Sequence, residues 1–415
     1  MSAKDMARAN YISSKLLGRK RNTVEIVTEE PIENIMKEIE TDTTIDRHNV
    51  MDMCQELLNE PVQTLNRKFA LEGLMFALNS TMPPQMVALD AAQAWTVYWI
   101  TNSMQVFDQE TLDDEDRRKI VDKLFLMSKD KGPFSGGESQ LPHIASTYAA
   151  INALALCNNI DNCWDALDRK AIYEWLLSLK QADGGFTTCN PVGECDTRGV
   201  YCALSVASLL NIVTDELTEG VVKYLENCQT YEGGFGATPF QDEAHGGYTF
   251  CAVASLCILN KLHTINVEKL MEWCSARQYN EELGLCGRGN KLVDGCYSFW
   301  VGSTAAMVEA TTGVECINKS ALRKYILNCC QSKTGIALRD KPGKNGDFYH
   351  TNYVLMGLVI TESTFKFKID AERKSPYDMV SVPSTTESAT SDLIPINPIY
   401  GLPADTVEKF HKHFT

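Results

Sequence analysis

A turn that contains glycine returns along this chain about every 50 residues, and this repeat limits the folds that the chain can adopt. The turn glycines are Gly136, Gly184, Gly233, Gly284 and Gly335. Four of the turns follow an apolar segment that carries an aromatic residue and ends in a glutamine: Gln181, Gln229, Gln278 and Gln331. An interval of this length accommodates two helices and their connections, so the sequence predicts a series of helical hairpins.

The segment after each turn is apolar on nearly every side and rich in Ala, Ser and Cys, as expected of a helix that is buried all round. These inner segments are 143–157, 198–212, 247–262, 297–312 and 350–360. The segments that end in glutamine carry more charge, which predicts an outer, amphipathic layer. A further pair at 67–82 and 88–107, followed by a helix at 111–129, completes the series. We therefore predict an all-α fold, an α/α toroid of six helical hairpins, whose closure leaves no exposed terminal repeat.

The two ends of the chain differ from the repeats. Residues 1–60 are polar and acidic and are predicted to form an N-terminal helical arm. The arm has one apolar stripe at helical spacing, made of Ile32, Ile35, Met36 and Ile39. Residues 61–370 are the predicted toroid domain. Residues 371–415 are a predicted Ser/Thr/Pro-rich tail that ends in a short helix, and 375–403 are expected to be mobile because they cannot bury enough apolar surface alone.

Composition restricts the function classes. The chain has 415 residues, of which 44% are hydrophobic and 22% charged, so it can bury a large core. Its net charge of −15 repels phosphate backbones and anionic membranes, so nucleic acid is not an expected partner. The 15 cysteines and an N-terminal stretch without an apolar signal core favour reduced thiols and a cytoplasmic location. No apolar run reaches the roughly 18 residues of a membrane-spanning helix, so we expect no membrane insertion.

Five aromatic residues occupy equivalent places near the start of the inner segments: Tyr148, Tyr201, Phe250, Trp300 and Tyr353. In a closed ring, equivalent positions converge on one axis at one depth. Each ring could instead pack against its own neighbours, which is the commoner role of a single aromatic residue. Five aromatic residues in phase favour a cavity that is lined by aromatic side chains.

Polar residues lie just before these aromatics, at the same end of the predicted ring: His143, Arg198, His245, Asp294 and His350. Asp294, Cys296 and His350 offer a carboxylate, a thiolate and an imidazole, a set that can bind zinc and leave its fourth position open. Gly295 would let the backbone turn so that both neighbouring side chains face one ion. Spacing alone leaves a structural role open, because an Asp-x-Cys pair is a weak signal and single histidines are commonly structural.

A second polar group points to an anion site. Arg288 and Lys291 lie shortly before Asp294, Tyr297 follows it, and His245 holds the equivalent place one repeat earlier. The two cations are either a solvated charge pair or part of a site for a buried anion such as diphosphate. Helix N-termini at the same rim would also favour an anion. A diphosphate site beside an apolar cavity is what an isoprenoid diphosphate requires.

Three segments resemble the signature segments of the protein prenyltransferase β-subunit family, most closely its farnesyltransferase branch. They are residues 245–251 (HGGYTFC), 294–300 (DGCYSFW) and 347–351 (DFYHT). The resemblance covers about residues 60–365, with a weaker likeness at 397–400. It implies an α/α toroid and an enzyme that transfers a farnesyl group from farnesyl diphosphate to the cysteine thiol of C-terminal CaaX motifs.

The same resemblance implies roles for individual residues. Asp294, Cys296 and His350 would bind one zinc ion, which holds the substrate cysteine as a thiolate. Asp340 matches a position associated with Mg²⁺, which would bridge the diphosphate. Charge on the departing diphosphate would be stabilised by His245, Arg288, Lys291 and Tyr297, of which the last two also count as catalytic residues. The other substrate-binding positions that it implies are Trp95, Trp99, His143, Ala145, Arg198, Tyr201, Tyr248, Cys251, Trp300, Tyr349 and Tyr353.

Three residues match the farnesyl-using pattern: Trp95, Asp340 and Tyr353. Trp95 stands where relatives that use geranylgeranyl diphosphate have a small residue, and its indole would shorten the pocket and exclude a fifth five-carbon unit. Ala92 and Ser146 depart from the serine and proline that are usual in the segments that read the last CaaX residue, so the preference at that residue stays open. The implied partners are a farnesyltransferase α subunit, in a heterodimer that this chain needs for activity, and CaaX proteins such as small GTPases.

Other functions remain compatible with the sequence. A geranylgeranyltransferase type I β subunit would share every zinc and diphosphate residue, and Trp95 argues against it and against a Rab-type β subunit. Triterpene cyclases resemble this chain in their turns, but they need an acidic catalytic cluster that faces the cavity. The dense acidic run of this chain, at 113–116, is expected to be a solvated helix start instead. A non-catalytic helical repeat scaffold would need no metal, so stoichiometric zinc in the purified heterodimer separates it from the enzymes.

Overall fold

The computed structural model describes residues 41–367, 376, 379–383 and 391–415. The chain divides into two compact units, Met1–Asp46 and Arg47–Thr415. The helix α2 (Asp42–Leu58) begins in the first unit and ends in the second. The apolar stripe predicted for the N-terminal arm lies outside the described residues.

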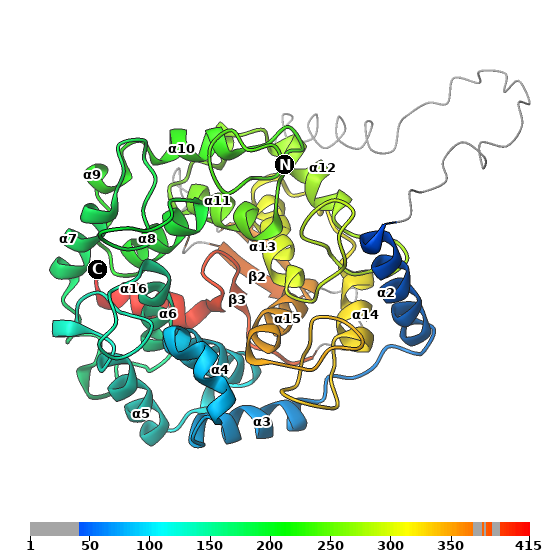
Figure 1. Ribbon diagram of the computed structural model, residues 1–415, viewed down its shortest axis with the longest axis horizontal. Helices are drawn as coiled ribbons and strands as arrows, with labels where there is room; N and C mark the ends of the chain where they lie inside the picture. The colour runs from blue at the N-terminus through cyan, green and yellow to red at the C-terminus, as the bar shows by residue number, and fades with distance from the viewer. Residues whose placement is uncertain (1–40, 368–375, 377–378, 384–390) are drawn as a thin grey trace, which may run out of the picture. The chain divides into compact units, whose positions relative to one another are not determined.

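Six helices of the described chain form the inner layer of the second unit. They are α4 (Gln93–Phe107), α6 (Ile144–Ala155), α8 (Thr197–Leu209), α11 (Gly246–Ile258), α13 (Tyr297–Thr312) and α15 (Phe348–Thr361). Each packs against the next in chain order, and α15 packs against α4, so that the layer closes on itself (Figure 1). These helices are buried on almost every side, as their apolar sequences predicted.

Six outer helices of the described residues surround this layer (Figure 1). They are α3 (Arg67–Asn79), α5 (Asp114–Phe125), α7 (Arg169–Leu179), α10 (Val221–Cys228), α12 (Val267–Ala276) and α14 (Lys319–Cys329). The short α9 (Asp215–Thr218) precedes α10, and the 3₁₀ segment Pro84–Ala92 leads into α4. The two closed layers confirm the predicted all-α toroid of six hairpins.

Three of the four glutamines that end the outer segments connect neighbouring hairpins: Gln229, Gln278 and Gln331. The side-chain amide of Gln278 accepts a hydrogen bond from the backbone N–H of Asn318 at 2.7 Å and donates one to its carbonyl oxygen at 3.0 Å. Gln331 accepts from the N–H of Asn66 at 2.8 Å and donates to the carbonyl oxygen of Thr64 at 3.0 Å. Because Asn66 caps the first outer helix and Gln331 follows the last, the second contact joins the two ends of the ring.

We expect Gln331→Leu to lower the stability of the ring. The change removes two hydrogen bonds between the last and first hairpins, which corresponds to about 1 kcal/mol in the free energy of unfolding and to about 2 °C in the thermal midpoint. Scanning calorimetry of the full chain measures this shift. Gln181→Leu is the matched control, since Gln181 donates only to Leu179 within its own turn. Equal effects of the two variants would contradict a role in ring closure.

The C-terminal segment fills the ring from the end opposite to the start of the inner helices. It forms two small antiparallel sheets, β1 (Ser363–Phe367) with β2 (Met379–Pro383) and β3 (Ile396–Asn397) with β4 (Leu402–Pro403), and then α16 (Ala404–His413). Ile399 and Tyr400 are fully buried, and the Tyr201 hydroxyl donates to the carbonyl oxygen of Ile399 at 2.7 Å. This segment therefore closes one end of the space inside the ring.

This arrangement differs from the expected mobile tail over residues 391–403. The expectation treated the tail as a segment that must fold alone, and its low apolar content makes that impossible. The inner helices instead supply the buried surface and the hydrogen-bond donors: the side chains of Tyr98 and Asn102 both donate to the carbonyl oxygen of Gly401, at 2.9 and 3.0 Å. Residues 384–390 lie outside the described chain. Within the described residues, no helix has both the length and the hydropathy that crossing a bilayer requires.

Candidate active site

Five inner helices begin at one rim, where a side chain accepts a hydrogen bond from a backbone N–H of the first turn. The acceptors and their partners are His143 with Ala145, Asp196 with Arg198, His245 with Gly247, Asp294 with Cys296, and Asp347 with His350, at 2.7 to 3.2 Å. Such short polar residues are preferred at helix starts because they satisfy N–H groups that lack a partner in the helix. The partial positive charge of several helix N-termini is thus collected at this rim.

A cavity of about 500 Å³ opens beside these helix starts. Its lining includes twelve of the predicted substrate-binding residues, which are Trp95, Trp99, Ala145, Arg198, Tyr201, His245, Tyr248, Cys251, Tyr297, Trp300, Tyr349 and Tyr353. Tyr148, Cys202 and Gly247 complete the lining. The walls are therefore mostly aromatic, which suits an extended apolar ligand.

Most of the predicted aromatic residues face this cavity, and one does not. Neighbouring rings are in contact, with centroids 5.4 Å apart for Tyr148 and Tyr201 and 4.2 Å apart for Trp300 and Tyr353. Phe250 is fully buried behind the lining, where it packs edge-on against Trp300. The next residue on its helix, Cys251, faces the cavity in its place, because a turn of 100° per residue separates their directions.

Asp294, Cys296 and His350 converge in three dimensions. One potential ligand atom from each lies within 4.8 Å of the other two. Asp294 and Cys296 come from the start of α13, and His350 comes from the first turn of the neighbouring α15. His350 adjoins the cavity, since its ring packs edge-on against the ring of Tyr349 with centroids 4.9 Å apart.

Gly295 allows this convergence by its small size. Its backbone φ is not among the positive values that favour glycine. A Cβ atom at this position would lie 2.7 Å from a side-chain carbon of Val354 and 3.0 Å from the carbonyl oxygen of Arg339. Any larger residue would push the start of α13 away from α15 and separate Cys296 from His350.

The three side chains shift one another's ionisation. Burial raises the pKa of Asp294, but the neighbouring imidazole of His350 lowers it more, so the net pKa lies below the usual value. Burial lowers the pKa of His350, yet the carboxylates of Asp294 and Asp347 raise it to about 9. Burial, followed by the charge of Asp294, raises the pKa of the Cys296 thiol well above its usual value. A carboxylate here therefore sits beside a protonated imidazole and a neutral thiol.

The donor set fits a bound zinc ion. The Nε2 atom of His350 is buried and has no hydrogen-bond partner in the described residues, although it lies 3.4 Å from a carboxylate oxygen of Asp294. A cation between them would satisfy both atoms and displace protons from Cys296 and His350, because metals bind the thiolate and the neutral imidazole. Carboxylate, thiolate and imidazole together are ligands that zinc accepts.

The predicted anion-binding residues are divided between the cavity and the rim. The Tyr297 hydroxyl lies 3.1 Å from Nε2 of His245, and both residues line the cavity. Arg288 lies outside the lining and pairs with Glu243 at 3.1 Å, while Lys291 is exposed. Arg198 is held by Asp196 at 2.6 Å.

Two further predicted positions lie beside the lining of the cavity without joining it. His143 caps α6 through its Nδ1 atom, and the carboxylate of Asp340 pairs with Lys341. Burial and the nearby charge of Asp294 raise the pKa of Asp340.

Comparisons with known proteins agree with this geometry. The prenyltransferase alpha-alpha toroid domain family matches residues 66–402. The chain is 54% identical to the protein farnesyltransferase subunit beta of Saccharomyces cerevisiae, over 99% of this chain and 97% of that one. The chain belongs to the protein farnesyltransferase β-subunit family. A second member of the family, from Schizosaccharomyces pombe, is 39% identical over 86% of this chain and 93% of its own length.

A solved structure supports the fold assignment for this family member. The Candida albicans protein geranylgeranyltransferase-I complexed with GGPP aligns with a TM-score of 0.68 at 20% identity, over 85% of this chain and 100% of that chain. At this identity the likeness concerns the toroid fold. The comparisons confirm the predicted fold and the predicted farnesyltransferase branch of the prenyltransferases.

Asp347 is a site residue of this family member to which the sequence reasoning gave no role. One of its carboxylate oxygens accepts from the backbone N–H of His350, and the other lies 2.7 Å from Nδ1 of the same histidine. It thereby turns Nε2 toward Asp294 and Cys296. The signal was available, because an acidic residue three positions before a histidine at a helix start can reach that imidazole.

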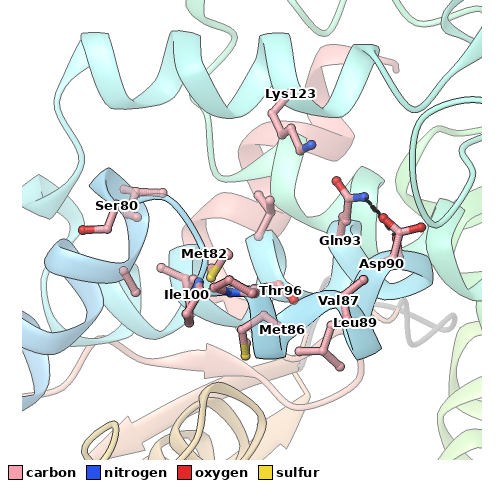
Figure 2. Close-up of a pocket in the computed structure, with 15 residues that line it drawn as sticks. Ser80, Met82, Met86, Val87, Leu89, Asp90, Gln93, Thr96, Ile100 and Lys123 are labelled. Carbon is pink, nitrogen blue, oxygen red and sulfur yellow. Dashed lines mark hydrogen bonds between the residues drawn. The ribbon is translucent and has the colours of Figure 1, made fainter.

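Two apolar grooves accompany the central cavity of this family member. One, of about 560 Å³, lies between the 3₁₀ segment Pro84–Ala92 and α4, with Lys123 of α5 above it (Figure 2). Gln93 donates to Asp90 at its edge at 2.9 Å. The other, of about 570 Å³, shares Trp99 and Tyr349 with the cavity. Of the two, the second therefore adjoins the candidate site.

Proposed function

We propose that this chain is the catalytic β subunit of a zinc-dependent protein farnesyltransferase, which transfers the farnesyl group of farnesyl diphosphate to the thiol of a C-terminal CaaX cysteine. The convergence of Asp294, Cys296 and His350 beside an aromatic cavity carries this proposal. Relatives that are named farnesyltransferase β subunits support it. A scaffold without catalysis would need neither a three-ligand metal set nor a lined cavity.

The metal ligands prepare the nucleophile. Zinc bound by Asp294, Cys296 and His350 would lower the pKa of a substrate thiol and so supply a thiolate at neutral pH. In the transfer, a bond forms between the sulfur and C1 of the farnesyl chain while the bond from C1 to the diphosphate oxygen breaks. The diphosphate departs with the electron pair.

Residues at the rim stabilise the negative charge that develops on the diphosphate. His245 and Tyr297 already lie together at the cavity wall and can donate hydrogen bonds to its oxygens. Arg288 and Lys291 lie on the neighbouring loop. Arg288 pairs with Glu243, and it would leave this partner to bind the anion. Asp340 is the candidate ligand for Mg²⁺, which would supply further positive charge beside the diphosphate.

The aromatic lining holds the isoprenoid chain. Tyr201, Trp300 and Tyr353 offer apolar faces along the cavity, and burial of each methylene group contributes about 0.8 kcal/mol. Trp95 packs against Tyr148 with centroids 5.5 Å apart and so limits the depth. The second substrate is a CaaX protein, and a farnesyltransferase α subunit is the proposed partner in a heterodimer.

We expect Asp347→Asn to weaken zinc binding about tenfold. Asparagine keeps an oxygen that caps α15 but loses the charge that orients the imidazole of His350. Competition with a chelator on the purified heterodimer measures the affinity. Asp168→Asn serves as the control, since Asp168 caps the outer helix α7 in a similar way. An unchanged zinc affinity would show that the orientation of His350 is set elsewhere.

The function is tested by transfer to a CaaX peptide. The chain is co-expressed with a farnesyltransferase-type α subunit, and farnesyl and geranylgeranyl diphosphate are offered in competition. We expect transfer of farnesyl that stops when zinc is removed and returns when it is restored. Preferred transfer of geranylgeranyl would overturn the farnesyl assignment, and no transfer of either lipid would favour the scaffold.

A further inference from the structure

The loop that carries two of the proposed diphosphate-binding cations accepts a hydrogen bond from a tyrosine outside it. This loop runs between Cys286 and Val293, which pair across its base, and it bears Arg288 and Lys291. The hydroxyl of Tyr279 donates to the backbone carbonyl oxygen of Lys291 at 2.8 Å. The side chain of Lys291 is exposed, so its reach toward the cavity depends on where this backbone contact holds its Cα atom.

Tyr279 is itself braced by a residue of α2. The guanidinium of Arg47 lies over the ring of Tyr279, 4.2 Å from its centroid, in a cation–π contact. The Nε atom of Arg47 also lies 4.0 Å from a carboxylate oxygen of Glu282.

The buried carboxylate of Glu282 favours the observed position of the Arg47 guanidinium. Its side chain is 1% exposed, and neither carboxylate oxygen has a hydrogen-bond partner in the described residues. A buried carboxylate is costly without a nearby positive charge. Arg47 supplies that charge while its flat face remains on Tyr279, so the three side chains form one connected group.

This group lies partly outside the range of residues that the family model matches. The prenyltransferase toroid domain matches residues 66–402, whereas Arg47 belongs to α2 and precedes that range. An element outside the toroid therefore contacts the residue that fixes the cation-bearing loop.

We propose that Tyr279, braced by Arg47, is a positioning residue that fixes Lys291 for binding of the prenyl diphosphate. This inference rests on the proposed function. Tyr279 is neither a candidate metal ligand nor part of the cavity lining, and it acts through the backbone of Lys291. With the carbonyl oxygen held, less of the binding free energy is lost in ordering the loop and its lysine. Without the hydroxyl, the ammonium group samples a larger volume.

Tyr279→Phe tests the inference, because it removes the hydroxyl and keeps the ring under Arg47. Farnesyl diphosphate binding to the purified heterodimer is measured by calorimetry, together with kcat and the KM of a CaaX peptide. We expect the dissociation constant for farnesyl diphosphate to rise about fivefold and kcat to fall, because Lys291 also stabilises the departing diphosphate, with peptide KM and zinc content unchanged. Tyr173→Phe is the matched control, since its hydroxyl bonds Thr214 on the outer layer.

Two further variants separate positioning from a general loss of structure. Arg47→Met should weaken diphosphate binding about threefold, and Arg47→Lys, which keeps the charge, should restore most of it. In a Lys291→Ala background, Tyr279→Phe should have no further effect, because the group that it positions is gone.

The possible outcomes separate the two hypotheses. Normal binding by the unchanged heterodimer with no effect of Tyr279→Phe would overturn the inference alone. An equal loss with and without Lys291 would also overturn it. A heterodimer that binds no farnesyl diphosphate would overturn the proposed function and this inference with it.

Discussion

Replacing Cys296 by alanine is expected to abolish zinc binding and lower prenyl transfer by at least about 1,000-fold. The change removes one of three ligands and leaves Asp294 and His350 without the soft donor between them. Because the substrate thiol would then keep its ordinary pKa, little thiolate would be present at neutral pH. Metal analysis of the heterodimer and single-turnover transfer to a CaaX peptide measure the two effects.

Cys228→Ala provides the control for this prediction. Cys228 is equally buried, but it lies on the outer helix α10 and belongs to no candidate metal set among the described residues. Its replacement should leave the zinc content at one ion per heterodimer and the transfer rate close to normal. Full activity of the Cys296 variant with the metal removed would refute the proposed mechanism.

Replacing Trp95 by threonine is expected to change the lipid that the enzyme prefers. The indole lines the cavity between Trp99 and Tyr148, with centroids 5.7 and 5.5 Å away. Its removal frees space for a further five-carbon unit, whose burial would favour the longer chain. We expect the ratio of kcat/KM for geranylgeranyl over farnesyl diphosphate to rise about 100-fold.

Competition between the two diphosphates on the heterodimer measures this ratio directly. Trp175→Thr is the matched control, because Trp175 lies on the outer helix α7 and does not line the cavity. An unchanged ratio in the Trp95 variant would mean that another part of the cavity sets its depth. The buried segment at Ile399 and Tyr400, which accepts hydrogen bonds from cavity tyrosines, would then be the next part to test.

The meeting of Asp294, Cys296 and His350 was expected from the family resemblance, and the repeat gave it independent support. Asp294 and His350 both lie at the start of an inner helix in successive repeats, and the starts of these helices share one rim of a closed ring. The same phase argument placed Tyr201, Trp300 and Tyr353 on one cavity. It failed for Phe250, because one residue of helical rotation decides whether a side chain faces the cavity or the wall behind it.

Charge pairing was beyond the reach of the sequence. Arg288 and Lys291 are close along the chain, but Arg288 is paired with Glu243. Only the fold brings Arg288 and Glu243 together. The contact of Arg47 with Tyr279 likewise joins residues that lie far apart in sequence. Such contacts depend on how loops of different repeats pack against one another, and the period of the sequence repeat does not predict this packing.

The sequence by itself determined the repeat, the two layers of helices and the aromatic character of the cavity. Each of these follows from residue type and spacing within one repeat, where helical geometry fixes direction. The tertiary structure decided the closure of the ring through Gln331 and Asn66, the burial of Ile399 and Tyr400, and the anchoring of Lys291 by Tyr279. These features depend on contacts between segments that are brought together only when the ring closes.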